Sequence, residues 1–169
     1  VVIAAGAWSR EITGLPRPIS VEPIRGQMAA LTWPQDIPPT IIIGQSTYIV
    51  PRAGEALLGS TMEHAGFAPD VSAAGLAQIF TGTTALCPAL ARGDVIRTWA
   101  GLRPVTPDGL PIVGREPELE GLWYATGHGR NGILLAAVTG VVLAHLINGD
   151  EDPGDLTPLR PERFWNWQG

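Results

Sequence analysis

The sequence predicts an α+β fold, with a mixed, largely antiparallel sheet and flanking helices. Between residues 27 and 62, short apolar runs alternate with turns that contain Gly or Pro, which is typical of a β-meander. Two longer segments, 73–87 and 132–147, are predicted to be helices. The strand–helix–strand alternation of a doubly wound domain is absent from the middle of the chain.

The first part of the chain is predicted to be mostly extended. Val1–Ala5 is an uninterrupted apolar run, typical of a strand buried in a parallel sheet. Because such a strand needs partners on its edges and faces, we expect further chain before it. A short helix is expected next, and Ser9 is placed to cap it. Strands are then expected at 27–32 and, as three short pieces, within 40–62.

The second part of the chain contains both longer helices. Ser72 is a suitable N-cap for the first of them, and Pro88 ends it. Strands are expected at 94–104 and 121–126. The segment 132–147 has apolar residues all round, which predicts a buried helix, and Asn148–Gly149 is a C-cap pair.

Composition argues against several classes of function. The net charge is −5, there is no lysine, and no run of arginines occurs, so electrostatic binding of nucleic acid is not expected. Cys87 is the one cysteine, which excludes an internal disulfide and fits a reduced, cytoplasmic location. No signal peptide is recognisable. The longest apolar stretch, 133–147, is short for a membrane span and carries His145, so no membrane contact is expected.

Two further features of composition bear on partners. Apolar residues make up 45% of the chain and charged residues only 16%, which predicts an apolar surface. Either the composition is simply biased, or part of this surface meets a partner. The three histidines show no metal-ligand spacing, so no metal site is expected.

The segment Gly-His-Gly-Arg-Asn-Gly at 127–132 matches the dinucleotide-binding pattern G-x-G-x-x-G between a strand and a helix. That pattern requires a second strand after the helix, with an acidic residue at its end. Here a segment rich in Pro and Gly follows instead. The motif therefore predicts a glycine-lined helix N-terminus that another group can approach closely, with Arg130 adding positive charge. The alternative is a glycine-rich surface turn.

Five segments occur in this order: VVIAAGAWS, GQMAAL, YIVPRAGEALLGSTME, WAGLRPVTPDGLPIVG and GLWYATGHGRNGILLAAVTG. Together they resemble the C-terminal half of the D-amino-acid oxidase superfamily of flavoproteins, most closely the glycine oxidases of thiamine biosynthesis. In that superfamily the FAD fingerprint lies near the N-terminus, which would be upstream of Val1 here. The missing FAD-binding half is therefore expected as a partner of this chain.

The resemblance implies both a domain organisation and a reaction. Residues 1–14 and 116–150 would belong to an FAD-binding α/β domain, 15–115 to a substrate-binding domain, and 151–169 to a C-terminal tail. The reaction would be oxidative deamination of a small amine or amino acid. Hydride would pass from the substrate Cα to flavin N5, the imine would hydrolyse to an oxo acid and ammonia, and oxygen would be reduced to hydrogen peroxide.

The resemblance also implies site residues. It places Arg103 where glycine oxidases bind the substrate carboxylate, and a planar guanidinium suits bidentate capture. Tyr48 is expected to help hold the carboxylate, Met62 to line the substrate pocket, and Arg130 to lie near the substrate amine and the flavin. The residues expected to contact FAD are Ala5, Gly6, Trp8, Gly127, His128, Gly129, Arg130, Asn131, Gly132 and Ile133. Gly129 departs from the family pattern, which more often has an aromatic residue there.

Simpler roles stay open at several of these positions. A structural ion pair with Asp108 or Glu63 is the alternative for Arg103. Packing alone is the alternative for Tyr48, Met62 and Trp8. No general base stands out, so no catalytic acid or base is assigned, which is consistent with direct hydride transfer.

Two other functions also stay open. One is a D-amino-acid dehydrogenase or a sarcosine-oxidase-like enzyme that uses another electron acceptor. The other is a binding module that kept the substrate-domain scaffold but lacks FAD and catalysis. The sequence leaves the oligomeric state open, including a homo-oligomer.

Overall fold

The computed structural model describes residues 1–150 and 154–165 of the chain. It divides into two compact units, which are described separately: unit 1 contains 1–24 and 103–169, and unit 2 contains 25–102. Parts of the predicted tail, 151–153 and 166–169, lie outside the described residues. The assignment of 1–14 and 116–150 to a cofactor-binding domain stays a prediction.

Unit 1 contains a mixed three-stranded sheet in the order β1-β8-β7. Its strands are β1 (Val2–Ile3), β7 (Ile112–Arg115) and β8 (Trp123–Thr126). β1 and β8 are parallel, with Val2 opposite Trp123, whereas β7 and β8 are antiparallel. The predicted strands at the chain start and at 121–126 are therefore present and pair with each other. The prediction that the segment 1–5 is a buried strand is wrong, since the strand spans two residues and Ile3 is the one buried residue of the segment.

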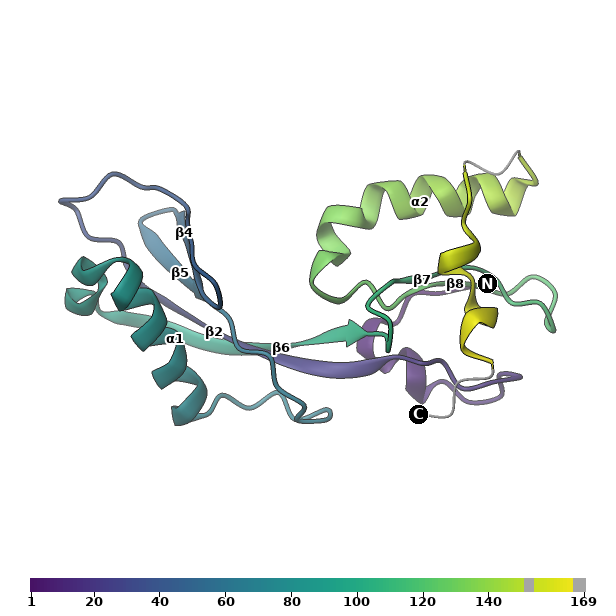
Figure 1. Ribbon diagram of the computed structural model, residues 1–169, viewed down its shortest axis with the longest axis horizontal. Helices are drawn as coiled ribbons and strands as arrows, with labels where there is room; N and C mark the ends of the chain where they lie inside the picture. Colours follow the sequence, from purple (N-terminus) through teal and green to yellow (C-terminus); the bar gives the residue numbers. More distant parts are fainter. Residues whose placement is uncertain (151–153, 166–169) are drawn as a thin grey trace. The chain divides into compact units, whose positions relative to one another are not determined.

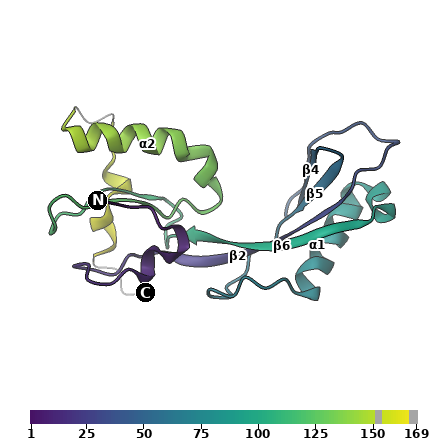
Figure 2. The same ribbon diagram turned by 180° about the vertical axis from the view of Figure 1, so that it is seen from behind.

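Several short 3-10 helices and one long α-helix complete unit 1. They are η1 (Gly6–Glu11), η3 (Gly129–Asn131), α2 (Gly132–Asn148), η4 (Thr157–Leu159) and η5 (Pro161–Phe164). α2 runs beside β7 and β8 in both views (Figures 1 and 2). Gly149 ends α2 in the left-handed region at φ 75°, as the C-cap prediction required. Ser9 does not cap η1, because its side chain lies in the interior of the unit.

The prediction that the long C-terminal helix is buried is wrong for the described residues. Leu143 is the one buried residue of α2 among them, whereas Ile133 is 97% exposed and Leu134 79% exposed. The sheet of unit 1 has only three short strands and covers a narrow stripe of the helix. By length and composition alone, the helical segment Gly129–Asn148 could cross a membrane. The shortness of the apolar stretch 133–147 therefore does not exclude a membrane span.

Unit 2 is built on a five-stranded sheet in the order β3-β4-β5-β2-β6. The strands are β2 (Glu22–Thr32), β3 (Ile42–Ile43), β4 (Tyr48–Arg52), β5 (Glu55–Gly59) and β6 (Val95–Val105). β3, β4, β5 and β2 pair antiparallel in succession, which confirms the predicted β-meander. β2 and β6 begin or end within unit 1.

Helix α1 (Ala73–Leu86) packs on one face of this sheet (Figure 1), and η2 (Pro88–Arg92) follows it. Ser72 caps α1 as predicted, since its side chain accepts a hydrogen bond from the backbone N–H of Gly75 at 3.1 Å. The core between helix and sheet consists of Ala29, Leu31, Ile49, Ala56, Leu58, Ile79, Cys87 and Leu90.

Strand alternation gives the sheet of unit 2 two different faces. Ala29, Leu58 and Ile49 are direct cross-strand neighbours on the α1 face. The residues one position away, Met28, Gly59 and Tyr48, are also direct neighbours and lie on the opposite face. We call this second face the open face of the sheet.

Candidate functional site

The two groups of residues predicted to contact FAD lie together at one edge of the sheet of unit 1. β1 and β8 are parallel, so their carboxyl ends lead into adjacent loops. The Thr126 hydroxyl at the end of β8 donates to the backbone carbonyl of Gly6 at 3.2 Å and lies 2.8 Å from Ser9 Oγ. The turn with Ala5, Gly6 and Trp8 therefore lies beside the start of the glycine-rich loop. The carboxyl ends of parallel strands are where ligands bind in α/β sheets.

Two glycines of the 127–132 loop are required by the backbone. Gly127 has φ 77° and Gly129 has φ 56°, both in the left-handed region. A Cβ at Gly127 would also lie 2.5 Å from Thr106 Cγ2, so a larger residue would not fit there. A Cβ at Gly129 would approach Val105 Cγ2 only to 3.9 Å. The loop is thus a chain path that glycine makes possible, but the close approach that the motif predicted is made at Gly127 by Thr106 of this chain, and open space remains beside Gly129.

His128 is held by its side chain to α2. Its Nε2 lies 3.0 Å from Thr139 Oγ1. Burial lowers the pKa of His128, so the imidazole is neutral at pH 7. The His128 carbonyl accepts a hydrogen bond from the backbone N–H of Asn131 at 3.0 Å. His128 therefore stabilises the loop and brings no positive charge to it.

The start of α2 has the features of a site for an anionic group. No side-chain hydrogen bond caps α2 at Asn131, and η3 leads directly into the helix, so the positive end of the helix dipole lies at this loop. Arg130 and Ile133 are exposed at the same place. A negatively charged or electron-rich group would be stabilised here by the helix dipole and by Arg130.

An isolated antiparallel bridge between Val105 and His128 joins the end of β6 to the glycine-rich loop. Arg103 lies two residues before Val105, and Arg130 lies two residues after His128. The bridge therefore brings the backbone segments that carry Arg103 and Arg130 close to each other in unit 1.

Asp108 and Glu63, the partners considered for a structural ion pair of Arg103, each bind another arginine, and the structural role stays an alternative for Arg103. Asp108 is bound by Arg163, with Nε 2.7 Å from Oδ2. Glu63 is bound by Arg25, with Nε 2.8 Å from Oε2. Both carboxylates thus already have a positively charged partner.

Tyr48 and Met62 both belong to unit 2. Tyr48 is half-buried on the open face, and its hydroxyl lies 3.9 Å from Met28 Sδ. Met62 follows β5 and is 60% exposed, so the alternative that it packs in the core is wrong for the described residues. The neighbouring Glu63 is fixed by Arg25 and also accepts from Gln27 Nε2 at 2.7 Å, which anchors the segment that carries Met62.

Several residues that shape these sites were missed by sequence reasoning. Met28 and Gly59 contact Tyr48, and Thr106 contacts Gly127. Alternation along β2 could have placed Met28 on the same face as Tyr48, given the strand pairing. Nothing local in the sequence indicates that Arg163 binds Asp108, because 55 residues separate them.

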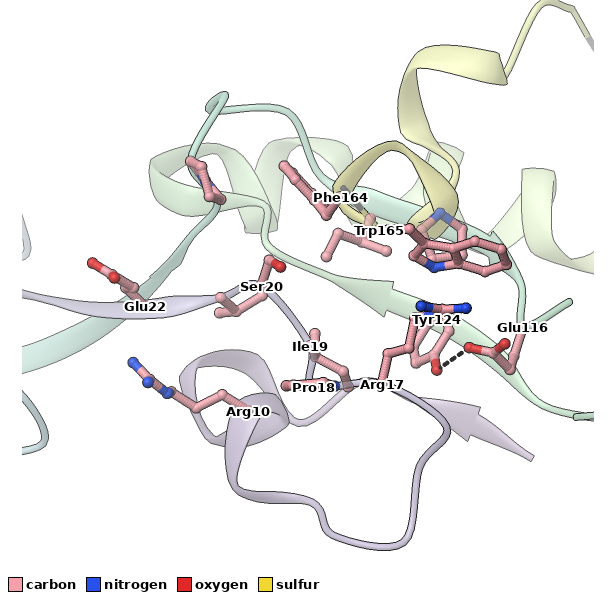
Figure 3. Close-up of a pocket in the computed structure, with 14 residues that line it drawn as sticks. Arg10, Arg17, Pro18, Ile19, Ser20, Glu22, Glu116, Tyr124, Phe164 and Trp165 are labelled. Atoms are coloured by element: carbon pink, nitrogen blue, oxygen red, sulfur yellow. Dashed lines mark hydrogen bonds between the residues drawn. The ribbon is translucent and has the colours of Figure 1, made fainter. Parts of the chain in front are cut away.

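A pocket of about 350 Å³ also lies in unit 1, and none of the predicted site residues lines it (Figure 3). Its charged lining residues are Arg10, Arg17, Glu22 and Glu116. Arg17 donates to Glu118 at 2.6 Å and stacks over Trp165 at 4.1 Å. The Tyr124 hydroxyl donates to Glu116 at 2.7 Å, and burial together with Glu116 raises the pKa of Tyr124.

Comparison with known proteins identifies the family. The chain matches the DAO family of FAD-dependent oxidoreductases over residues 1–146. It is 39% identical to a glycine oxidase of Pseudomonas putida over 166 residues, which cover 96% of this chain and 45% of the relative.

Solved structures agree with this match. The glycine oxidase of Geobacillus kaustophilus superposes with a TM-score of 0.86 at 36% identity, over 95% of this chain and 44% of that one. Iminodiacetate oxidase from Chelativorans sp. BNC1 gives 0.88 at 28% identity, over 95% and 45%. The predicted α+β fold is confirmed by these matches, although the chain spans less than half the length of these relatives. The chain belongs to the DAO family of FAD-dependent oxidoreductases, whose members bind FAD.

Proposed function

We propose that this chain is the substrate-facing part of an FAD-dependent oxidase that oxidatively deaminates glycine or a similar small amino acid. The bridge between Val105 and His128 is the observation that carries the proposal. It joins the strand end that bears Arg103 to the glycine-rich loop that bears Arg130. This adjacency within unit 1 supports the proposal that Arg103 binds a carboxylate beside a loop that contacts the cofactor.

The residues of this edge fit a flavin ring. Gly129 leaves space beside the loop, and the positive end of the α2 dipole lies there without a side-chain cap. When bound, FAD would supply the two-electron acceptor for the reaction. Residues 127–133 would hold its ring through their backbone, and the turn at 5–8 would lie beside it. The helix dipole would stabilise negative charge on that ring, which is a form of electrostatic preorganisation.

The substrate would be held by its carboxylate. The Arg103 guanidinium of unit 1 would bind both oxygens. For Tyr48, in unit 2, the role expected from the resemblance is a hydrogen bond from its hydroxyl to a substrate carboxylate. Glycine and iminodiacetate each carry an amine nitrogen and a carboxylate on one carbon, which is the pattern that these groups would recognise. Oxidation removes two electrons and two protons from the C–N bond to give an imine. Water converts the imine to an oxo acid and an amine, and oxygen accepts the electrons to give hydrogen peroxide.

The apolar surface of α2 supports action as part of a larger assembly. Val138 and Val141 are more than half exposed, in addition to the residues at the helix start. A contiguous apolar surface of this kind marks an interaction site. We propose that it packs against the polypeptide that supplies the remainder of the FAD site. A role in thiamine biosynthesis and a cytoplasmic location are further expectations.

Anaerobic bleaching of flavin absorbance in the whole protein would test the proposal. Glycine, sarcosine, D-alanine and D-proline would be added one at a time, with an amine that lacks a carboxylate as the control. We expect glycine or sarcosine to bleach the flavin at low concentration, and the control amine to bleach it only at a much higher concentration. Readmitted oxygen should then restore the colour and yield hydrogen peroxide. Recolouring only with a dye acceptor would indicate a dehydrogenase, and no bleaching by any amino acid would contradict the proposal.

A further inference from the structure

We propose that Gly59 is a positioning residue for Tyr48. Because Gly59 has no side chain, the Tyr48 ring can lie across β5, and this fixes the position of its hydroxyl. The inference rests on the proposed function, in which Tyr48 helps to hold a substrate carboxylate. Gly59 itself would not touch the substrate.

The register of the sheet places the two residues directly opposite each other. Tyr48 on β4 pairs with Gly59 on β5, and Gly59 pairs in turn with Met28 on β2. A Cβ atom added to Gly59 would lie 2.5 Å from both Cζ and the hydroxyl oxygen of Tyr48, and 2.9 Å from Cε2. Carbon atoms do not approach so closely, so the ring occupies the space that a side chain at 59 would need.

Met28 limits the ring on its far side. The Tyr48 hydroxyl lies 3.9 Å from Met28 Sδ, within reach of a weak hydrogen bond to sulfur. The ring thus extends from β4 over Gly59 towards β2. A side chain confined in this way loses little further entropy when its hydroxyl binds a ligand, which favours binding.

The geometry also predicts which part of the protein would move in a variant. The atoms that a new methyl group would meet are the far end of the tyrosine side chain, whereas no backbone atom is among them. Gly59→Ala should therefore displace the Tyr48 ring and leave the β5 backbone in place. One hydrogen bond to a charged group would be lost or misaligned, so KM for glycine should rise about tenfold. The rate constant kcat should change little.

A double-mutant cycle separates this effect from a general structural one. KM would be measured for glycine and for an amine without a carboxylate, in the wild type, Gly59→Ala, Tyr48→Ala and the double variant of the whole protein. We expect Gly59→Ala to raise KM for glycine alone, and to add less than about twofold when Tyr48 is already alanine. An equal loss in both backgrounds, or an equal loss for the uncharged amine, would overturn the proposal.

Gly82→Ala is a matched control on the other side of the sheet. A Cβ at Gly82 in α1 would lie 2.7 Å from Thr47 Cγ2, a similarly close contact that does not involve the Tyr48 ring. This variant should lose stability but keep the ratio of KM values for the two substrates. If Gly82→Ala changes that ratio as much as Gly59→Ala does, the specific role of Gly59 is excluded.

NMR of ring-labelled tyrosine tests whether Gly59 fixes the position of the Tyr48 ring, and it does so without measuring enzyme activity. The Tyr48 signal, assigned by its loss in Tyr48→Ala, should shift in Gly59→Ala, while the Tyr124 signal should stay in place. An unshifted Tyr48 signal would overturn the proposal. If the wild type oxidises no amino acid, the proposed function fails, but this spectrum still shows whether Gly59 positions the ring.

Discussion

Arg103 lies near the end of β6 and is half-buried, and we propose that it binds the substrate carboxylate. Arg103→Ala in the whole protein should raise KM for glycine or sarcosine by about 10- to 100-fold, since a charge-assisted bidentate contact is lost. KM for an amine without a carboxylate should change far less. Arg103→Lys should recover only part of the loss, because an ammonium cannot bind both oxygens in the same plane. Equal losses for both substrates would remove Arg103 from carboxylate binding.

Asp108 and Arg163 fix the turn that packs against Gly127. Arg163 binds the Asp108 carboxylate and also donates to the carbonyl of Leu110 at 2.7 Å. The Thr106 hydroxyl donates to the same Leu110 carbonyl, also at 2.7 Å. Thr106 in turn fills the space beside Gly127. The Asp108–Arg163 pair therefore supports the glycine-rich loop indirectly, through Thr106.

This pair should make stability depend on pH. Burial alone would raise the pKa of Asp108, but hydrogen bonds from Arg163, the Leu110 N–H and Thr106 hold it below its ordinary value of 3.8. A lowered carboxyl pKa stabilises the fold above the ordinary value, and this stability is lost as pH falls through the lowered one. Arg163→Ala should cost about 2 kcal/mol at pH 7. In urea unfolding the difference from wild type should shrink below about pH 4, and a constant difference down to pH 2 would contradict this role.

At the scale of elements, the start of α1 shows how a strand can anchor a helix. Gln27 on β2 is fully buried, and its Oε1 accepts from the Ser72 backbone N–H at 2.8 Å. Its Nε2 donates to Ser72 Oγ at 3.0 Å and to Glu63 at 2.7 Å. A Cβ at Gly75 would lie 2.3 Å from the Gln27 amide nitrogen, so the first turn of α1 must carry glycine there.

Two substitutions should distinguish the contribution of the Ser72 cap to stability from that of Gln27 on β2. Ser72→Ala removes one cap and should cost about 1 kcal/mol. Gln27→Leu leaves the Ser72 N–H and one Glu63 oxygen without this partner in the interior, and should cost about 2–3 kcal/mol. Urea unfolding followed by circular dichroism would measure both. A larger loss of unfolding free energy for Ser72→Ala than for Gln27→Leu would show that α1 depends more on its cap than on its contact with β2.

Local signals predicted most elements, and long-range packing explains where they failed. The meander, the Ser72 cap and the Gly149 end of α2 each follow from residues a few positions apart, which is the range that patterns report. Ser9 matched a cap pattern, but its hydroxyl lies beside Thr126, which is 117 residues away. The Tyr48–Gly59–Met28 row likewise depends on strand register, which the sequence does not specify. The glycine-rich motif was correctly placed before a helix, while the bridge to Val105 required the fold.

At the scale of the whole molecule, α2 is the main departure from prediction. Its composition is that of a buried helix, yet the described residues cover little of it. The same apolar surface fits a protein partner or a lipid bilayer by composition alone. The positions of Thr139 and Gly149 favour a protein partner, because Thr139 ties the helix to His128 and Gly149 ends it within the fold of unit 1.

The 169-residue chain purified alone should therefore be colourless and inactive. Its one G-x-G-x-x-G segment leads into α2 and then into a Pro-rich stretch, and the described residues 154–165 of that stretch form no second strand of the kind that completes a dinucleotide site. The edge formed by the 5–8 turn and residues 127–133 would then contact only part of FAD, and the exposed face of α2 should cause self-association. Visible absorbance after purification with excess FAD would measure retained flavin, with heat-released flavin as the control. Sedimentation of the wild-type chain and of a double variant, Val138→Gln with Val141→Gln, would measure self-association, which should be weaker in the double variant. Stoichiometric flavin in the purified chain would show that these residues hold the cofactor without further polypeptide.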